Sequence, residues 1–316
     1  MFIENMMTTA EQVVILYIVV AVGFLAVKTD LFTQKTAKSC TNLLFFIITP
    51  AVIINSFLNI DYSPDMTKKL FTAIGCGLLM HFLFSVLSLP LFRKGDKNRN
   101  SIFKYACIHG NCGYMALPLA NAVLGSEGVI FCSAIIISFQ ICAYTYGIYL
   151  MSGDKNSAEK SYKFGIKNIF LNTGVISVAI GMPLYLLQLP IPDIAKVPVE
   201  YIASMNTPLA MLIFGTYIAG TDFRSILREK KILTVGVFKL IIFPLMMLGI
   251  YSLLGIRGTL LASLILSASA PPANNTVIFA AKYDKDTGLA AQTVTAVSLV
   301  SILTMPAIIA LSMSLM

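Results

Sequence analysis

Two short stretches, at about 110–118 and 269–275, combine Pro, Gly and Asn within otherwise apolar sequence. Proline lacks a backbone N–H and clashes with the preceding helical turn, and Asn favours helix caps over helix interiors. Each stretch therefore predicts a broken helix, whose free N–H groups and Asn amides suit the oxygen atoms of a bound anion. The predicted substrate-binding residues of these stretches are Asn111, Gly113, Pro118, Pro271, Pro272, Asn274 and Asn275.

Lys239 and Asn55 complete the predicted binding residues. Lys239 is the only charged residue well inside an apolar segment, so it could attract an anion or occupy the place of a coupling cation. Alternatively it snorkels, because eight or nine helical residues put it about 12–13 Å from the predicted cytoplasmic end. Asn55 and Gln140 could face a cavity, and hydrogen bonds between helices explain them equally well.

Enzymatic chemistry is not expected, because the chain has no HExxH, no GxSxG and no acidic dyad within its apolar segments. Cys107, His109 and Cys112 lie close together but lack a fourth ligand nearby, so we predict no metal site. No cofactor is expected. None of the 15 acidic residues lies deep in an apolar segment, which disfavours a carboxylate-based proton or sodium site. Sodium could still bind backbone carbonyls and Asn side chains, so the coupling stays open.

The elements that position these residues are transmembrane helices. Of 316 residues, 57% are hydrophobic and 12% charged, against about 25% charged in soluble domains. Because a span needs about 20 apolar residues, we predict ten, joined by short connections. They lie at about 12–28, 39–59, 69–92, 101–124, 128–151, 168–188, 199–220, 231–254, 258–281 and 288–314.

The basic residues set the predicted orientation. Alternate connections hold eighteen of the 23 Lys and Arg residues, and the opposite side holds only four. Lys and Arg gather on the cytoplasmic side, so both termini are predicted outside the cytoplasm, with the plasma (inner) membrane as the location. This bias also explains the net charge of +8 without nucleic acid as a partner; the lipid bilayer is the expected partner.

The chain also repeats itself at an offset of about 160 residues. Thr49–Pro50 matches Thr207–Pro208, and Lys68–Lys69 matches Lys230–Lys231. Five spans per half give the halves opposite orientations, which is typical of an inverted repeat. We therefore predict an all-α membrane protein with a first repeat at 1–151, a cytoplasmic connecting loop at 152–167 and a second repeat at 168–316. The broken fourth and ninth spans occupy equivalent places and are expected to cross.

The sequences GNCGYMALPL in the fourth span, SAPPANN-TVIFAAKY in the ninth and SLVSILTMP in the tenth resemble the auxin efflux carrier family, which includes bacterial organic-acid permeases and plant PIN carriers. The resemblance covers the whole chain. One departure is Ala116, where relatives commonly have glycine. The resemblance implies ten helices in a fold like that of bile-acid symporters and sodium–proton antiporters. Spans 1, 2, 6 and 7 would form a scaffold that often dimerises, and spans 3–5 and 8–10 a moving transport domain.

The expected function is transport of a small organic acid anion by alternating access, either secondary active or facilitative. Malate, malonate and auxin-like carboxylates are the substrates that the resemblance implies, and a homodimer is the implied assembly. Two alternatives remain at this point: a sodium-coupled symporter of similar fold for another substrate, and a channel.

Overall fold

The computed structural model describes residues 2–153, 170–219 and 229–314, which form helices and the turns between them. Among these residues, six helical stretches are long and apolar enough to cross a membrane, and three shorter apolar helices accompany them. The chain is thus an all-α, multi-pass membrane protein. The loop predicted at 152–167 lies, from residue 154 on, outside the described residues.

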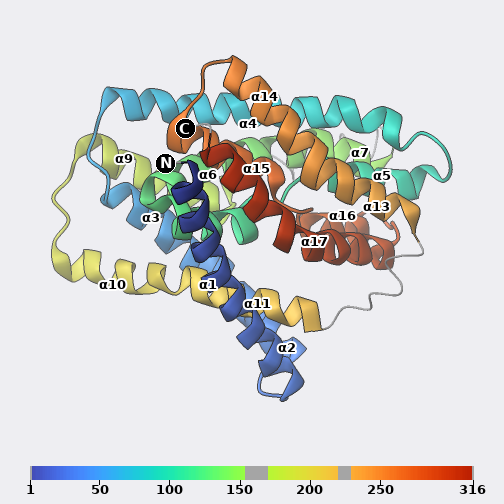
Figure 1. The fold of residues 1–316 in the computed structure, drawn as a ribbon, viewed down its shortest axis with the longest axis horizontal. Coiled ribbons are helices and arrows are strands. Elements are labelled where there is room, and N and C mark those ends of the chain that lie inside the picture. Colours follow the sequence, from blue (N-terminus) through green and yellow to red (C-terminus); the bar gives the residue numbers. More distant parts are fainter. Residues whose placement is uncertain (1, 154–169, 220–228, 315–316) are drawn as a thin grey trace.

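Figure 1 shows the long helix α4 running along one edge of the molecule, with α1 crossing α11 in the lower part of the view. The part before residue 154 contains α1 (Phe2–Lys28), α2 (Gln34–Leu43), η1 (Leu44–Ile48), α3 (Thr49–Leu58), α4 (Pro64–Leu91), α5 (Lys97–Ile108), η2 (Cys112–Ala116), α6 (Leu117–Cys142), η3 (Ala143–Gly147) and α7 (Ile148–Ser152). The later part contains α9 (Thr173–Leu187), α10 (Asp193–Ser204), α11 (Asn206–Ala219), α13 (Lys230–Val237), η4 (Phe238–Ile242), α14 (Phe243–Leu253), α15 (Gly258–Ser269), α16 (Asn275–Lys282) and α17 (Thr287–Met313).

The six long stretches correspond to the second, third, seventh, eighth and tenth predicted spans and to Leu117–Ser152, which joins part of the fourth to the fifth. Leu117–Ser152 is bent at Gly125, whose φ of 65° and ψ of −158° interrupt the helix. Glycine adopts such a positive φ without a Cβ clash. The first, sixth and ninth predicted spans correspond to the shorter apolar helices. The ten-span count and the inverted repeat stay predictions.

Of the four π-helical turns in the described part of the chain, η1, η2 and η4 each end two residues before a proline. The prolines are Pro50, Pro118 and Pro244, each at the first turn of the following α-helix. A proline clashes with the carbonyl four residues earlier, and that residue is the middle one of the π turn in all three cases. The wider π turn therefore relieves the clash. Pro183, by contrast, lies inside the continuous helix α9.

The helices α1 and α11 approach each other through glycine. A Cβ added at Gly23 would overlap the Leu212 carbonyl, and one added at Gly215 would overlap the Val20 carbonyl. Only glycine allows two helix backbones so close, and small residues of this kind are typical of helix pairs in membranes.

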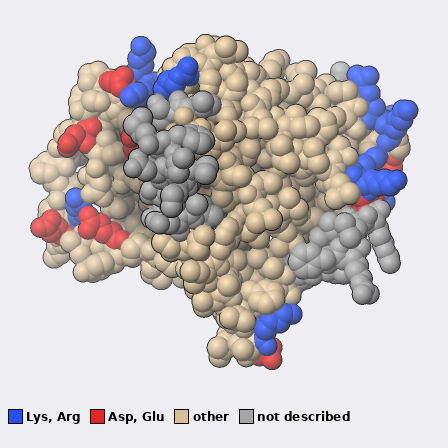
Figure 2. All heavy atoms as spheres, in the orientation of Figure 1, with Lys and Arg blue, Asp and Glu red and all other residues tan. Residues whose placement is uncertain are grey.

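Charged side chains gather toward the ends of the molecule, with a broad uncharged band between them on the face in Figure 2. At one end, Arg99 pairs with Glu229 at 2.5 Å, Lys231 donates to Asn100 at 2.7 Å, and Lys285 donates to Asn98 at 2.5 Å. These contacts join the start of α5, the start of α13 and the turn between α16 and α17. All three regions were predicted to be cytoplasmic.

Candidate functional site

The two predicted breaks lie against each other. Helix α5 ends at Ile108 and η2 begins at Cys112, while α15 ends at Ser269 and α16 begins at Asn275. Between them, Gly110 and Pro272 form an antiparallel bridge. The Asn111 N–H donates to the Pro271 carbonyl at 2.7 Å, and the Ala273 N–H donates to the His109 carbonyl at 2.9 Å. These bonds satisfy backbone groups that would be very costly to leave unpaired inside a membrane.

The first break is shorter than the predicted 110–118 stretch. Only residues 109–111 are non-helical, because Gly113 lies in η2 and Pro118 lies in the first turn of α6. The Pro118 carbonyl accepts a hydrogen bond from the Thr207 hydroxyl at 3.2 Å, which links α6 to α11. Pro271 and Pro272 lie in the second break, as their chemistry requires.

A cavity of about 330 Å³ opens beside the crossing breaks. Of the predicted binding residues, Asn111, Gly113, Asn274 and Asn275 line it. Pro118, Pro271, Pro272, Lys239 and Asn55 are not among its lining residues. Asn55 lies near the other end of α3, where its carbonyl and side chain accept from the Asn59 amide. The structure therefore brings together the Asn residues of both breaks and leaves Asn55 apart from them.

Asn274 and Asn275 face this cavity at the start of α16. Asn274 occupies the N-cap position, but its side chain makes no capping hydrogen bond. Among the described residues, neither side chain has a hydrogen-bond partner, and neither do the two backbone N–H groups. Because a helix N-terminus carries partial positive charge, this corner of the cavity offers N–H donors to an anion.

The rest of the lining comes from elements that the broken-helix pattern did not indicate. Gln140 lies on α6 and Tyr144 on η3, while Thr49 follows η1. From the sequence, Gln140 could face a cavity or bond to another helix, and in the structure it lines the cavity. Its Oε1 atom is buried without a partner among the described residues. Asn172 also lines the cavity, and its side chain caps α9 by accepting from the Gly174 and Val175 N–H groups. The described lining contains no Lys, Arg, Asp or Glu.

Lys239 lies behind the crossing, away from the cavity. Its side chain is fully buried, so it does not snorkel to a surface. The ammonium donates to the Ala268 carbonyl at 3.3 Å and lies 4.9 Å from the centre of the Phe84 ring. A Cβ added at Gly110 would lie 3.0 Å from Lys239 Nζ, so the lysine contacts the rear of the crossing directly.

His81 and His109 are also fully buried near the crossing, with ring centres 5.9 Å apart. The Nδ1 atom of each lies at hydrogen-bonding distance from a carbonyl four residues earlier, that of Gly77 or Tyr105. Among the described residues, no group of three or more His, Cys, Asp or Glu side chains is placed to hold a metal ion.

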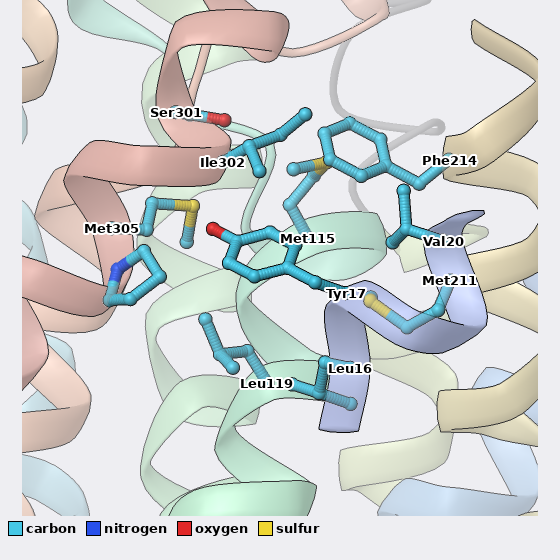
Figure 3. Close-up of a pocket in the computed structure, with 11 residues that line it drawn as sticks. Leu16, Tyr17, Val20, Met115, Leu119, Met211, Phe214, Ser301, Ile302 and Met305 are labelled. Carbon is cyan, nitrogen blue, oxygen red and sulfur yellow. The ribbon is translucent and has the colours of Figure 1, made fainter. Parts of the chain in front are cut away.

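A second, smaller cavity of about 40 Å³ has an almost entirely apolar lining. It lies between α1, α11, α17 and the start of α6, and three methionines line it: Met115, Met211 and Met305. In Figure 3 the Tyr17 hydroxyl points across this space toward the α17 side. This hydroxyl is buried without a partner among the described residues.

Comparison with known proteins gives consistent matches over the full length. A family model described as membrane transport protein matches residues 8–309. The chain is similar to an uncharacterized transporter of Methanocaldococcus jannaschii, with 25% identity over 299 residues that cover 91% of this chain and 94% of the relative. It is also similar to an uncharacterized transporter of Methanothermobacter thermautotrophicus, with 23% identity over 305 residues that cover 95% and 97% of the two chains.

Proposed function

Because the chain belongs to the membrane transport protein family, that of the auxin efflux carriers, we propose that it moves small organic anions across the membrane by alternating access. The family supports a carrier rather than an enzyme.

The observation that carries the proposal is the pair Asn274 and Asn275 at the cavity. Their amides and backbone N–H groups have no partner among the described residues, and they lie at the positive end of α16. Asn111 and Gln140 add polar groups to the same cavity. At about 330 Å³, the space suits a small mono- or dicarboxylate such as malate, malonate or an auxin-like acid. N–H groups and dipoles, rather than a lysine or arginine, would hold the carboxylate.

The proposed architecture has ten spans in two inverted halves, 1–151 and 168–316. The direct pairing of the two breaks supports it, and so does the distribution of loops. Contacts at one end join three regions predicted as cytoplasmic. The lining of a third cavity includes Asp61, Asp65, Ser126 and Glu127, from two connections predicted outside. We place the protein in the plasma (inner) membrane with both termini outside the cytoplasm.

Both of the other cavities lie where a scaffold would meet a moving domain. Thr49 and Asn172 contribute to the substrate cavity from predicted spans 2 and 6, while Asn111 and Asn275 contribute from spans 4 and 9. The methionine-lined cavity likewise takes its lining from spans 1 and 7 of the scaffold and from spans 4 and 10 of the moving domain. Flexible methionine side chains can repack as surfaces slide. This arrangement supports rigid movement of spans 3–5 and 8–10 against spans 1, 2, 6 and 7.

Purified protein tests the proposal through its thermal stability against a panel of mono- and dicarboxylates. A ligand that binds the folded state raises the free energy of unfolding by about 2.7 kcal/mol at 100 times the dissociation constant, so the melting temperature rises with ligand concentration. We expect at least one small carboxylate to stabilise the protein and to exchange across proteoliposomes with saturable counter-flow. Saturable counter-flow distinguishes a carrier from a channel.

The variant Asn275→Ala, matched by Asn59→Ala outside the cavity, tests the assigned residues. Removing a hydrogen bond to a charged group costs about 1.5–3 kcal/mol, so carboxylate affinity should fall roughly 10- to 150-fold in Asn275→Ala. Asn59→Ala should bind as wild type. The proposal fails if no carboxylate in the panel binds or exchanges, and the site assignment fails if Asn275→Ala retains wild-type affinity.

A further inference from the structure

Lys239 is a buried positive charge that the proposed substrate site does not use. It lies in η4, is fully buried, and forms none of the ion pairs found among the described residues. Its ammonium has a carbonyl acceptor, Ala268, and an aromatic face, Phe84. Phe84 in turn stacks on Phe243 with ring centres 4.5 Å apart. A carbonyl and a ring face are both groups that favour a cation.

The Lys239 ammonium lies at the end of a broken helix. The last carbonyls of a helix lack intrahelical partners and carry partial negative charge. Ala268 belongs to the last turn of α15, which ends at Ser269 at the second break. Gly110, two residues past the end of α5, lies against the same ammonium. The carbonyl end of α15 and the chain just past the end of α5 therefore meet at one buried ammonium.

The ammonium and the cavity lie on opposite sides of the crossing. Gly110 and Cys112 line the cavity, whereas Lys239 is absent from its lining and reaches the rear of Gly110. Lys239 thus acts on the site only through the crossing backbone, as a positioning residue. Crossing carbonyl ends are also the groups that would ligate a bound monovalent cation such as sodium.

We propose that Lys239 is the built-in cation of the crossing: its ammonium, held by the carbonyl end of α15 against Gly110, occupies the place of a dissociable cation, so that anion binding needs no coupling cation. This inference rests on the proposed function, because it names the coupling of the same site. It excludes the sodium-coupled alternative for this chain.

The wild-type protein gives the first test. Carboxylate affinity is measured in sodium chloride and in choline chloride at equal ionic strength. The two dissociation constants should agree within about twofold. A tenfold loss of affinity when choline replaces sodium overturns the inference but leaves the carboxylate carrier intact. Failure of every carboxylate to bind in either salt is a failure of the proposed function instead.

The variant Lys239→Ala gives the second test, with the exposed Lys230→Ala on α13 as its control. In choline, Lys239→Ala should lose at least tenfold in carboxylate affinity, and sodium or methylammonium should restore part of it by filling the vacated place. Lys230→Ala should show neither effect. Unchanged affinity of Lys239→Ala in choline overturns the inference. So does a loss of affinity that small cations do not restore, because a purely packing role predicts no rescue.

The melting temperature of the unliganded protein decides the inference independently of any carboxylate. Sodium and methylammonium should raise the melting temperature of Lys239→Ala relative to choline and leave that of the wild type unchanged. The substitution Lys239→Met keeps the unbranched apolar stem, is one atom shorter and removes the charge, so it serves where the alanine variant does not fold. Cation-specific stabilisation of the wild type, or none in either variant, overturns the inference.

Discussion

At the scale of single residues, Gly110 is the position where the crossing leaves least room. A Cβ there would lie 3.0 Å from Lys239 Nζ and 3.1 Å from the Ala270 carbonyl. We therefore expect Gly110→Ala to destabilise the protein by about 1–3 kcal/mol, as overpacking of a dense interior does, and to weaken carboxylate binding. A thiol-reactive dye measures the melting temperature, because four of the six cysteines are buried until the protein unfolds.

Gly113 provides the matched control for this prediction. It lines the same cavity three residues further on, and a Cβ added there would meet nothing within 4 Å. Gly113→Ala should therefore unfold at the wild-type temperature or slightly above, since alanine also reduces the entropy of the unfolded chain. Equal melting temperatures for the two alanine variants would contradict the close approach at Gly110.

Residue chemistry predicted the break residues better than it predicted which side of the crossing they face. Pro271–Pro272 and the neighbouring Asn residues indicate a break because their effects on the backbone are local. The side on which Lys239 lies depends on how α13–α14 packs, which apolar sequence does not record. Membrane helices are apolar on every face, so hydropathy does not show which face of a helix points inward. It therefore cannot predict that Gln140 faces the cavity and Asn55 does not.

At the scale of elements, the prolines of the apolar helices act in two different ways. Pro50 and Pro244 each follow a π turn, whereas Pro183 does not. From the sequence alone, each of the three is expected to produce an isolated kink. The sequence does not distinguish a bend from a π turn, because the packing of neighbouring helices also contributes to that choice. The turn η4, which holds Lys239, accommodates Pro244 five residues later.

The variant Pro244→Ala tests this relation. Alanine restores the backbone N–H and has a helix propensity about 3 kcal/mol better than proline, so the π turn should relax to an α-helix. Losing the extra residue rotates one side of the helix by about 100° relative to the other, which moves Lys239 away from Ala268. Carboxylate affinity should fall at least tenfold, with partial rescue by sodium, although the helix itself becomes more favourable.

Pro183→Ala is the control for that variant, because Pro183 is exposed in a helix without a π turn. It should keep wild-type affinity and show no effect of sodium. Wild-type binding by Pro244→Ala would contradict the prediction that Pro244 maintains the π turn η4 and, through it, the position of Lys239.

At the scale of the whole molecule, sequence supplied the class of fold, while the structure added the pairing of its parts. The basic residues predicted which connections share a side, and Arg99–Glu229 and Lys231–Asn100 now join two of those connections. The bridge between Gly110 and Pro272 joins residues more than 150 positions apart, a contact that no local pattern encodes. The homodimer stays a prediction from the family resemblance.

The proposed topology of the whole chain has a direct test in reporter fusions. With ten spans, the cytoplasmic bias of Lys and Arg places residue 96 inside and both residue 61 and the C-terminus outside. Alkaline phosphatase, which folds only outside the cytoplasm, should be active when fused after Asp61 or at the C-terminus and inactive after Asp96. Green fluorescent protein should give the reverse pattern. Equal phosphatase activity at Asp96 and the C-terminus would mean an even number of spans between them, and two inverted halves of five would then be excluded.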